Sequence, residues 1–84
     1  MRIEVAGQNA FIVYFAEQTS AAVSAQIQAA ADSIIASMGE AIIDLVPSYA
    51  SLLVVFDLDR SDPFAVRRQL RAAIDAIEAG ERGA

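Results

Sequence analysis

The stretch IDLVPSYASLLVVFD, from Ile43 to Asp57, decides the fold. Two apolar runs flank a Pro-Ser-Tyr-Ala turn, which predicts two antiparallel strands joined as a hairpin. The second run, Leu52 to Phe56, contains no polar residue. A strand with one face in water should alternate between apolar and polar residues, so we expect this strand to be covered on both faces in its complete assembly.

The same reasoning places two further strands and two helices around this stretch. Alternating or β-branched runs indicate strands, and apolar residues at a spacing of three or four indicate helices. The predicted strands are Arg2–Ala6, Ala10–Phe15, Glu40–Val46 and Ser51–Asp57, and the predicted helices are Ala21–Met38 and a second that begins at Pro63.

Capping residues set the expected ends of the helices. Ser20 or Thr19 should cap the first helix and Asp62 the second, because their side-chain oxygens can accept from free amides of the first turn. We expect Gly39 and Gly80 to end the two helices, and residues 81–84 to form a frayed tail. Pro47 should end the third strand.

The element order ββαββα predicts an α+β fold. The expected architecture is a two-layer sandwich, with a four-stranded antiparallel sheet and two helices on one face. A chain of 84 residues forms one domain.

Composition excludes several classes of chemistry. The chain has no cysteine, histidine or lysine, so thiolate, imidazole and Schiff-base chemistry are absent. The net charge of −5 makes nucleic acid a poor partner. No run is long enough for a signal peptide or a membrane span, so we expect no membrane partner and a cytoplasmic location.

The sheet face away from the helices should be apolar, whichever set of side chains lies on it. A contiguous apolar patch is unusual on a monomer, so we expect it to dock on another domain, another subunit or a second copy of the chain. The candidate interaction residues are Pro47, Ser48, Tyr49, Ser51, Leu53, Val55, Ile12 and Tyr14. Tyr49 is the most suggestive, since a turn that contains proline presents its phenol.

The charged residues predict no catalytic or metal site. The loop with Asp57, Asp59 and Asp62 lacks the glycine and closing glutamate of a calcium loop. The strip formed by Arg67, Arg68 and Arg71 could contact an anion, or form a solvated helix face in which Asp75 and Glu78 pair with Arg71. We therefore expect no catalytic residue, no metal and no cofactor in this domain.

The turn and the following strand carry a family resemblance. VPSYASLLVVFD, Val46 to Asp57, resembles a motif of the KipI family of 5-oxoprolinase subunits, also labelled allophanate hydrolase subunit 1. GQNAFIVYFAEQTS, Gly7 to Ser20, is similar to that family's N-terminal motif. The chain departs from the family pattern at Tyr14, Ala16 and Ala50.

The resemblance implies that residues 1–84 form the family's N-terminal domain, with its C-terminal cyclophilin-like domain absent. Members of the family act with two further subunits in the ATP-dependent opening of 5-oxoproline to glutamate, so ATP is a cofactor of the complex. The implied role is that of a non-catalytic interaction domain in such an amidohydrolase complex. Two alternatives stay open: a regulatory module that inhibits a sensor histidine kinase, and a self-associating structural domain.

Overall fold

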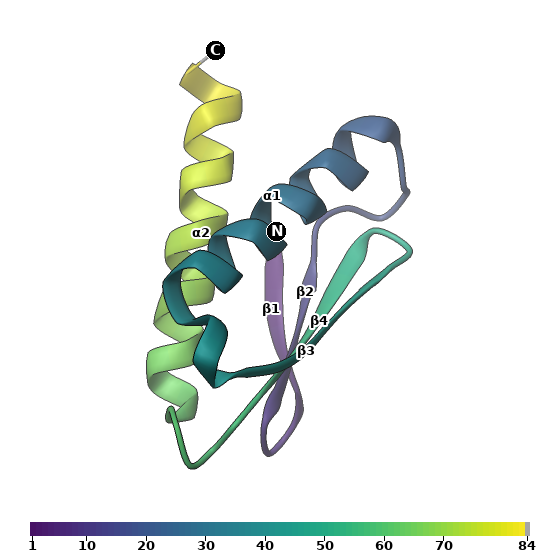
Figure 1. Cartoon of the computed structure of the whole chain (residues 1–84). Helices are drawn as coiled ribbons and strands as arrows, with labels where there is room; N and C mark the ends of the chain where they lie inside the picture. The colour runs from purple at the N-terminus through teal and green to yellow at the C-terminus, as the bar shows by residue number, and fades with distance from the viewer. Residues whose placement is uncertain (84) are drawn as a thin grey trace.

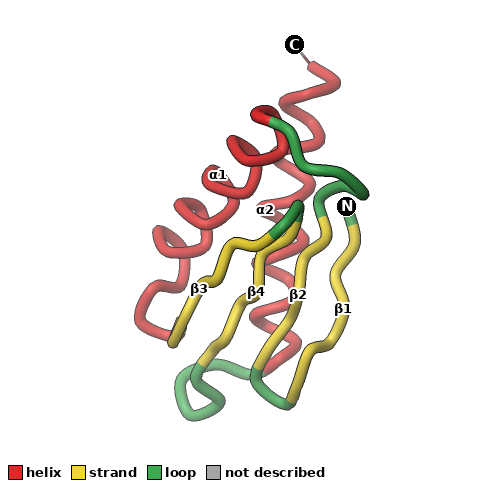
Figure 2. The backbone as a smooth tube through the Cα atoms, turned by 90° about the vertical axis from the view of Figure 1, so that its right-hand side faces the viewer, coloured by secondary structure: helices red, strands yellow, loops and turns green. Residues whose placement is uncertain are grey.

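The computed structural model of the chain describes residues 1–83, with side chains as far as Gly80. Its strands are β1 (Arg2–Gly7), β2 (Ala10–Tyr14), β3 (Ile42–Ser48) and β4 (Ser51–Phe56), and its helices are α1 (Ala21–Met38) and α2 (Pro63–Gly83). Figure 1 shows these elements along the chain, and Figure 2 shows both helices on the same side of the sheet. The predicted α+β sandwich is confirmed.

The sheet has the order β1-β2-β4-β3, and all neighbouring strands are antiparallel. The two hairpins therefore meet through β2 and β4, which are the central strands. In this register Val13 lies opposite Leu52, and Ile12 lies opposite Leu53. Because paired residues point to the same side of a sheet, the register decides which apolar residues enter the core.

The core lies between the helices and one face of the sheet. Val13, Leu52, Val54 and Phe56 are at most 1% exposed, and the ring of Phe11 stacks on that of Phe56 with centroids 5.7 Å apart. The helices contribute Ile27, Ala30 and Ile34 from α1, and Val66, Leu70 and Ile74 from α2. Helical spacing of apolar residues thus predicts the buried stripe of each helix correctly.

Both predicted N-caps are present. The Ser20 hydroxyl accepts from the Val23 amide at 3.1 Å, and the Asp62 carboxylate accepts from the Ala65 amide at 2.8 Å. Pro63 follows as the first residue of α2, where its missing N–H breaks no helical hydrogen bond.

Helix α1 ends at Met38, directly before Gly39, as predicted, whereas α2 ends later than predicted. Gly39 keeps right-handed backbone angles, with φ −54°, and leads into a short 3₁₀ turn, Gly39–Ala41, so β3 begins at Ile42 instead of Glu40. Helix α2 continues through Gly80 to Gly83. One interior glycine costs a helix only about 1 kcal/mol, which good helix formers on either side offset. The frayed tail is thus wrong for residues 81–83, and Ala84 lies outside the described residues.

Two features of β3 also correct the sequence prediction. Pro47 lies inside the strand, which an edge position allows because one side of an edge strand needs no amide donor. The register shifts between Ile42 and Asp44, as in a β-bulge. As a result Ile42 and Leu45 both pack against the core, although strict alternation places them on opposite faces.

Candidate docking face

The face of the sheet away from the helices carries side chains from all four strands. Three rows cross it, and each row is fixed by strand pairing. They are Arg2–Tyr14–Ser51–Ser48, Glu4–Ile12–Leu53–Val46 and Ala10–Val55–Asp44. We call this surface the open face. No element among residues 1–83 covers it, as the view in Figure 2 shows.

The centre of the open face is apolar. Ile12, Leu53 and Val55 are half-buried by their neighbours within the sheet, and Val46 is 40% exposed. Charges lie only at the margins, with Arg2 and Glu4 on one edge strand and Asp44 on the other. The result is a contiguous apolar surface with a polar rim, the arrangement that protein interfaces show.

A hollow of about 480 Å³ adjoins one end of the open face. It is lined by Met1, Arg2, Tyr14, Phe15, Ala16, Glu17 and Tyr49. The Arg2 guanidinium carbon lies 4.5 Å from the centre of the Tyr14 ring, and Arg2 Nε donates to Glu4 at 2.9 Å. These contacts hold Arg2 over the aromatic end of the face.

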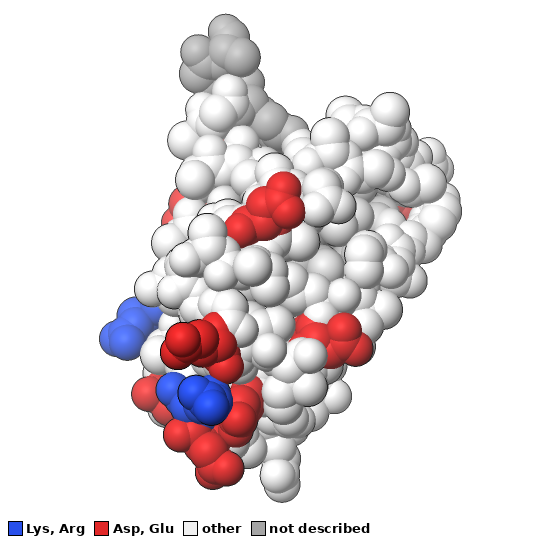
Figure 3. Space-filling view, viewed as in Figure 1, with Lys and Arg blue, Asp and Glu red and all other residues white. Residues whose placement is uncertain are grey.

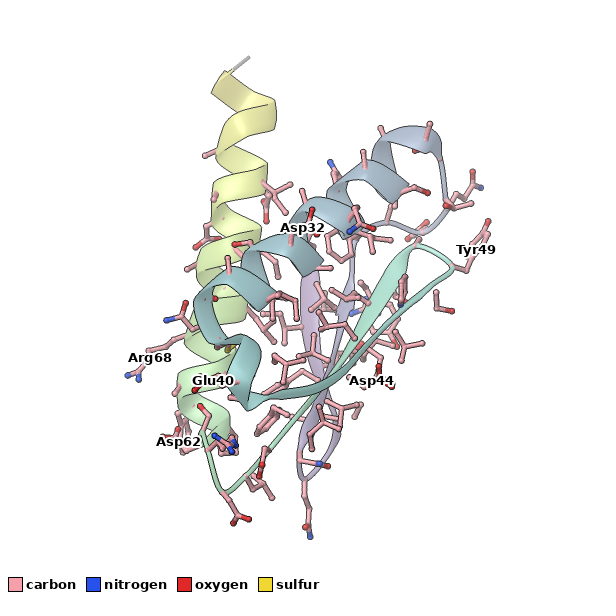
Figure 4. All side chains as sticks on the ribbon, viewed as in Figure 1. Asp32, Glu40, Asp44, Tyr49, Asp62 and Arg68 are labelled. Carbon is pink, nitrogen blue, oxygen red and sulfur yellow. The ribbon has the colours of Figure 1, made fainter. Side chains whose placement is uncertain are left out.

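The β3–β4 turn presents Tyr49 beside this hollow. Tyr49 is 67% exposed and lies at the tip of the hairpin in Figure 4. The next residue, Ala50, has φ +57°, the one positive φ of a non-glycine residue among those described. Its carbonyl accepts from the Phe15 amide at 2.8 Å and its side chain is 2% exposed, so the turn is tied to the end of β2.

The structure brings most of the predicted interaction residues together. Ile12, Tyr14, Ser48, Leu53 and Val55 share the open face, and Tyr49 stands at its end. Ser51 lies in the same row but is only 5% exposed, so it offers little surface for contact. Pro47 is different, because it pairs with the buried Leu52 and therefore lies on the helix side of the edge strand.

Sequence reasoning missed two exposed apolar residues of β3. Val46 joins the central row of the open face, and Ile43, at the register shift, is 61% exposed. Alternation along the strand could have indicated Val46 once its partner Leu53 was known, but the shift between Ile42 and Asp44 obscures that alternation.

The acidic loop uses its carboxylates to organise the backbone. Asp57 accepts from the Asp59 amide at 2.9 Å, and Asp62 caps α2. Within residues 1–83, no three acidic side chains come close enough together to hold a metal ion. Neither helix there is both long and apolar enough to cross a membrane. Within the described residues, the open face is thus apolar at its centre and carries no group of carboxylates for a metal ion.

Comparison with known proteins identifies the family of this chain and solved structures with a similar fold. The family model described as carboxyltransferase domain, subdomain C and D, matches residues 1–84. It agrees with the resemblance drawn from the turn motif, since this family is found in 5-oxoprolinase subunits and KipI-like proteins. No curated protein matches the chain.

Two solved structures are similar. The conserved uncharacterized protein PH0987 from Pyrococcus horikoshii is 26% identical with a TM-score of 0.75, and the match covers 93% of this chain and 38% of that chain. TTHA0988 is 24% identical with a TM-score of 0.62, covering 75% of this chain and 13% of that one, and shows the fold alone. The chain therefore spans well under half the length of either structure.

Proposed function

We propose that this chain, which belongs to the family of carboxyltransferase domains, subdomains C and D, is a non-catalytic interaction domain of a 5-oxoprolinase-type amidohydrolase complex. The open face and the Tyr49 turn dock on the rest of that complex. One observation carries the proposal: Ile12, Leu53 and Val46 form a continuous apolar row that no described element covers.

The energy of covering this face favours docking. Burying roughly 300 Å² of apolar surface contributes about 7 kcal/mol. Association opposes this gain by several kcal/mol or more, so additional contacts are needed for stable binding. Tyr49 and the hollow beside it supply such contacts, since exposed tyrosines are frequent anchors in protein interfaces.

A similar structure indicates what could cover the open face. The match to PH0987 covers 38% of that chain, so the relative carries more polypeptide beside the matched domain. By the family resemblance, the occupant in this protein is a cyclophilin-like domain or another subunit of the 5-oxoprolinase-type complex, with ATP bound by the complex and not by this domain.

Binding of the purified chain to the other two subunits of such a complex tests the proposal. Isothermal titration should show a complex that Leu53→Ser weakens at least tenfold, because a leucine buried at an interface contributes about 2 kcal/mol. Leu58→Ser is the matched control, since Leu58 is 48% exposed but lies in the loop after β4. Its affinity should equal that of the wild type.

Three results would count against the proposal. One is equal weakening by the two serine variants, which indicates non-specific adhesion. Another is that the purified chain binds neither of the two subunits. A third is binding to a sensor histidine kinase with inhibition of its autophosphorylation, which favours the regulatory alternative.

A further inference from the structure

A second surface lies on α2, away from the open face. It consists of Phe64, Arg67, Arg68 and Arg71, and we call it the arginine strip. These residues follow a spacing of three and four along the helix and line a hollow of about 360 Å³. Phe64 is 79% exposed, and Figure 4 shows Arg68 pointing away from the sheet. The strip and the open face can therefore be occupied at the same time.

The arginine strip does not serve the core or the helix. Its four residues are all exposed, whereas the buried side of α2 consists of Val66, Leu70 and Ile74. Arg67 and Arg71 are four residues apart, and like charges at that spacing destabilise a helix. An aromatic residue and three cations exposed together thus have no role in folding.

The strip also lacks the ion pairs that one interpretation of the sequence requires. If the strip were a solvated helix face, Arg71 would pair with Asp75 and Glu78. Among the described residues, the two salt bridges are Arg2–Glu4 at 2.9 Å and Arg60–Asp57 at 3.7 Å. Neither pair of Arg71 is therefore formed in the described part of the chain, and three guanidinium groups concentrate positive charge on a chain whose net charge is −5. In the view of Figure 3, arginine side chains and several acidic side chains lie together in the lower half, where α2 begins.

We propose that the arginine strip docks an acidic segment of a partner polypeptide. Guanidinium groups match carboxylates with two parallel hydrogen bonds, and an apolar side chain of the same segment packs on Phe64. Arginine and aromatic residues are enriched at the energetic centres of protein interfaces. Nucleic acid fits less well, because the strip is limited to four residues on about two helical turns, and an extended polyanion would also meet the eleven acidic residues of the chain, whereas a short acidic segment need not.

Nuclear magnetic resonance of the isotopically labelled full chain tests this proposal. The probe is a synthetic peptide of glutamates around one central leucine, and the comparison peptide has glutamine in place of each glutamate. The glutamate peptide should give saturable shifts confined to residues 64–71, and its affinity should fall as salt is raised. The glutamine peptide should give none, since it carries no carboxylate.

Variants separate a specific site from general charge attraction. The double variant Arg67→Gln with Arg71→Gln should weaken the peptide about tenfold, since each exposed ion pair contributes a factor of up to about five. Phe64→Ala should weaken it severalfold. Arg60→Gln removes one positive charge outside the strip and should leave affinity unchanged. Unchanged urea midpoints for these exposed positions establish that each variant is folded.

Several results overturn the proposal. These are the absence of saturable shifts, shifts centred on the open face, or equal weakening by Arg60→Gln and the double variant. Inorganic tripolyphosphate serves as a further probe. If it shifts the amides of residues 64–71 at concentrations at which the peptide does not, the strip is a phosphate site and not a docking site for an acidic segment.

Discussion

Leu52 and Leu53 are adjacent residues of β4 that should respond very differently to truncation. Leu52 is 0% exposed within the core, whereas Leu53 lies half-buried on the open face. Leu52→Ala should leave a cavity between the sheet and the helices. Leu53→Ala opens no cavity, because one side of that residue already faces solvent in the isolated chain.

The expected difference is large compared with the stability of the domain. Leu52→Ala should cost about 3–5 kcal/mol, and Leu53→Ala about 1 kcal/mol or less, mainly through lost contacts within the sheet. A domain of this length has an unfolding free energy of about 4–13 kcal/mol. Since 1 kcal/mol shifts the melting temperature of such a domain by about 4–8 °C, Leu52→Ala should lower it by at least about 12 °C.

Urea unfolding followed by circular dichroism measures both changes. The two variants and the wild type should share one m-value, so that the shift in midpoint reports stability alone. Equal losses for the two variants would refute the assignment of faces, because they would mean that Leu53 is as enclosed as Leu52. A loss below about 1 kcal/mol for Leu52→Ala would refute it as well.

Further predictions concern the helix caps and the β3–β4 turn. Ser20→Ala removes the acceptor of the Val23 amide and should cost about 1 kcal/mol in urea unfolding, with Ser20→Asn near neutral. Asp62→Ala removes the acceptor of the Ala65 amide and should cost a similar amount, whereas Asp62→Ser should restore most of it. Ala50→Val should cost at least about 2 kcal/mol, because a β-branched residue at φ +57° is strained and its extra methyls have no space; a neutral effect in thermal unfolding would contradict that backbone angle.

Periodicity in the sequence was sufficient to predict the elements and their order. It could not predict which face of the sheet the helices cover, because the face depends on the pairing of β2 with β4, strands separated by a helix and another strand. Once Val13 is paired with Leu52, the apolar residues of the open face follow. The sequence therefore indicated an apolar outer face, but its geometry needed the register.

The predictions were wrong where the surrounding structure overrides the conformational preference of a single residue. Pro47 stays in a strand because β3 is at the edge, and Gly80 stays in a helix because its neighbours favour helix. Ala50 offered no signal, because alanine rarely adopts a positive φ; the hydrogen bond from the Phe15 amide and burial of its side chain accompany that conformation. In each case the backbone conformation depends on neighbouring parts of the structure, which a local sequence pattern does not include.

Methyl cross-saturation in a complex with the other two subunits, both unlabelled, tests the central claim, that the open face is the docking surface. We expect loss of signal at the methyls of Ile12, Leu53 and Val55, whereas the methyls of Leu58 and of Ile35, which is exposed on α1, should be unaffected. Saturation centred on Ile35 or Leu58, with the methyls of the open face unchanged, would contradict it.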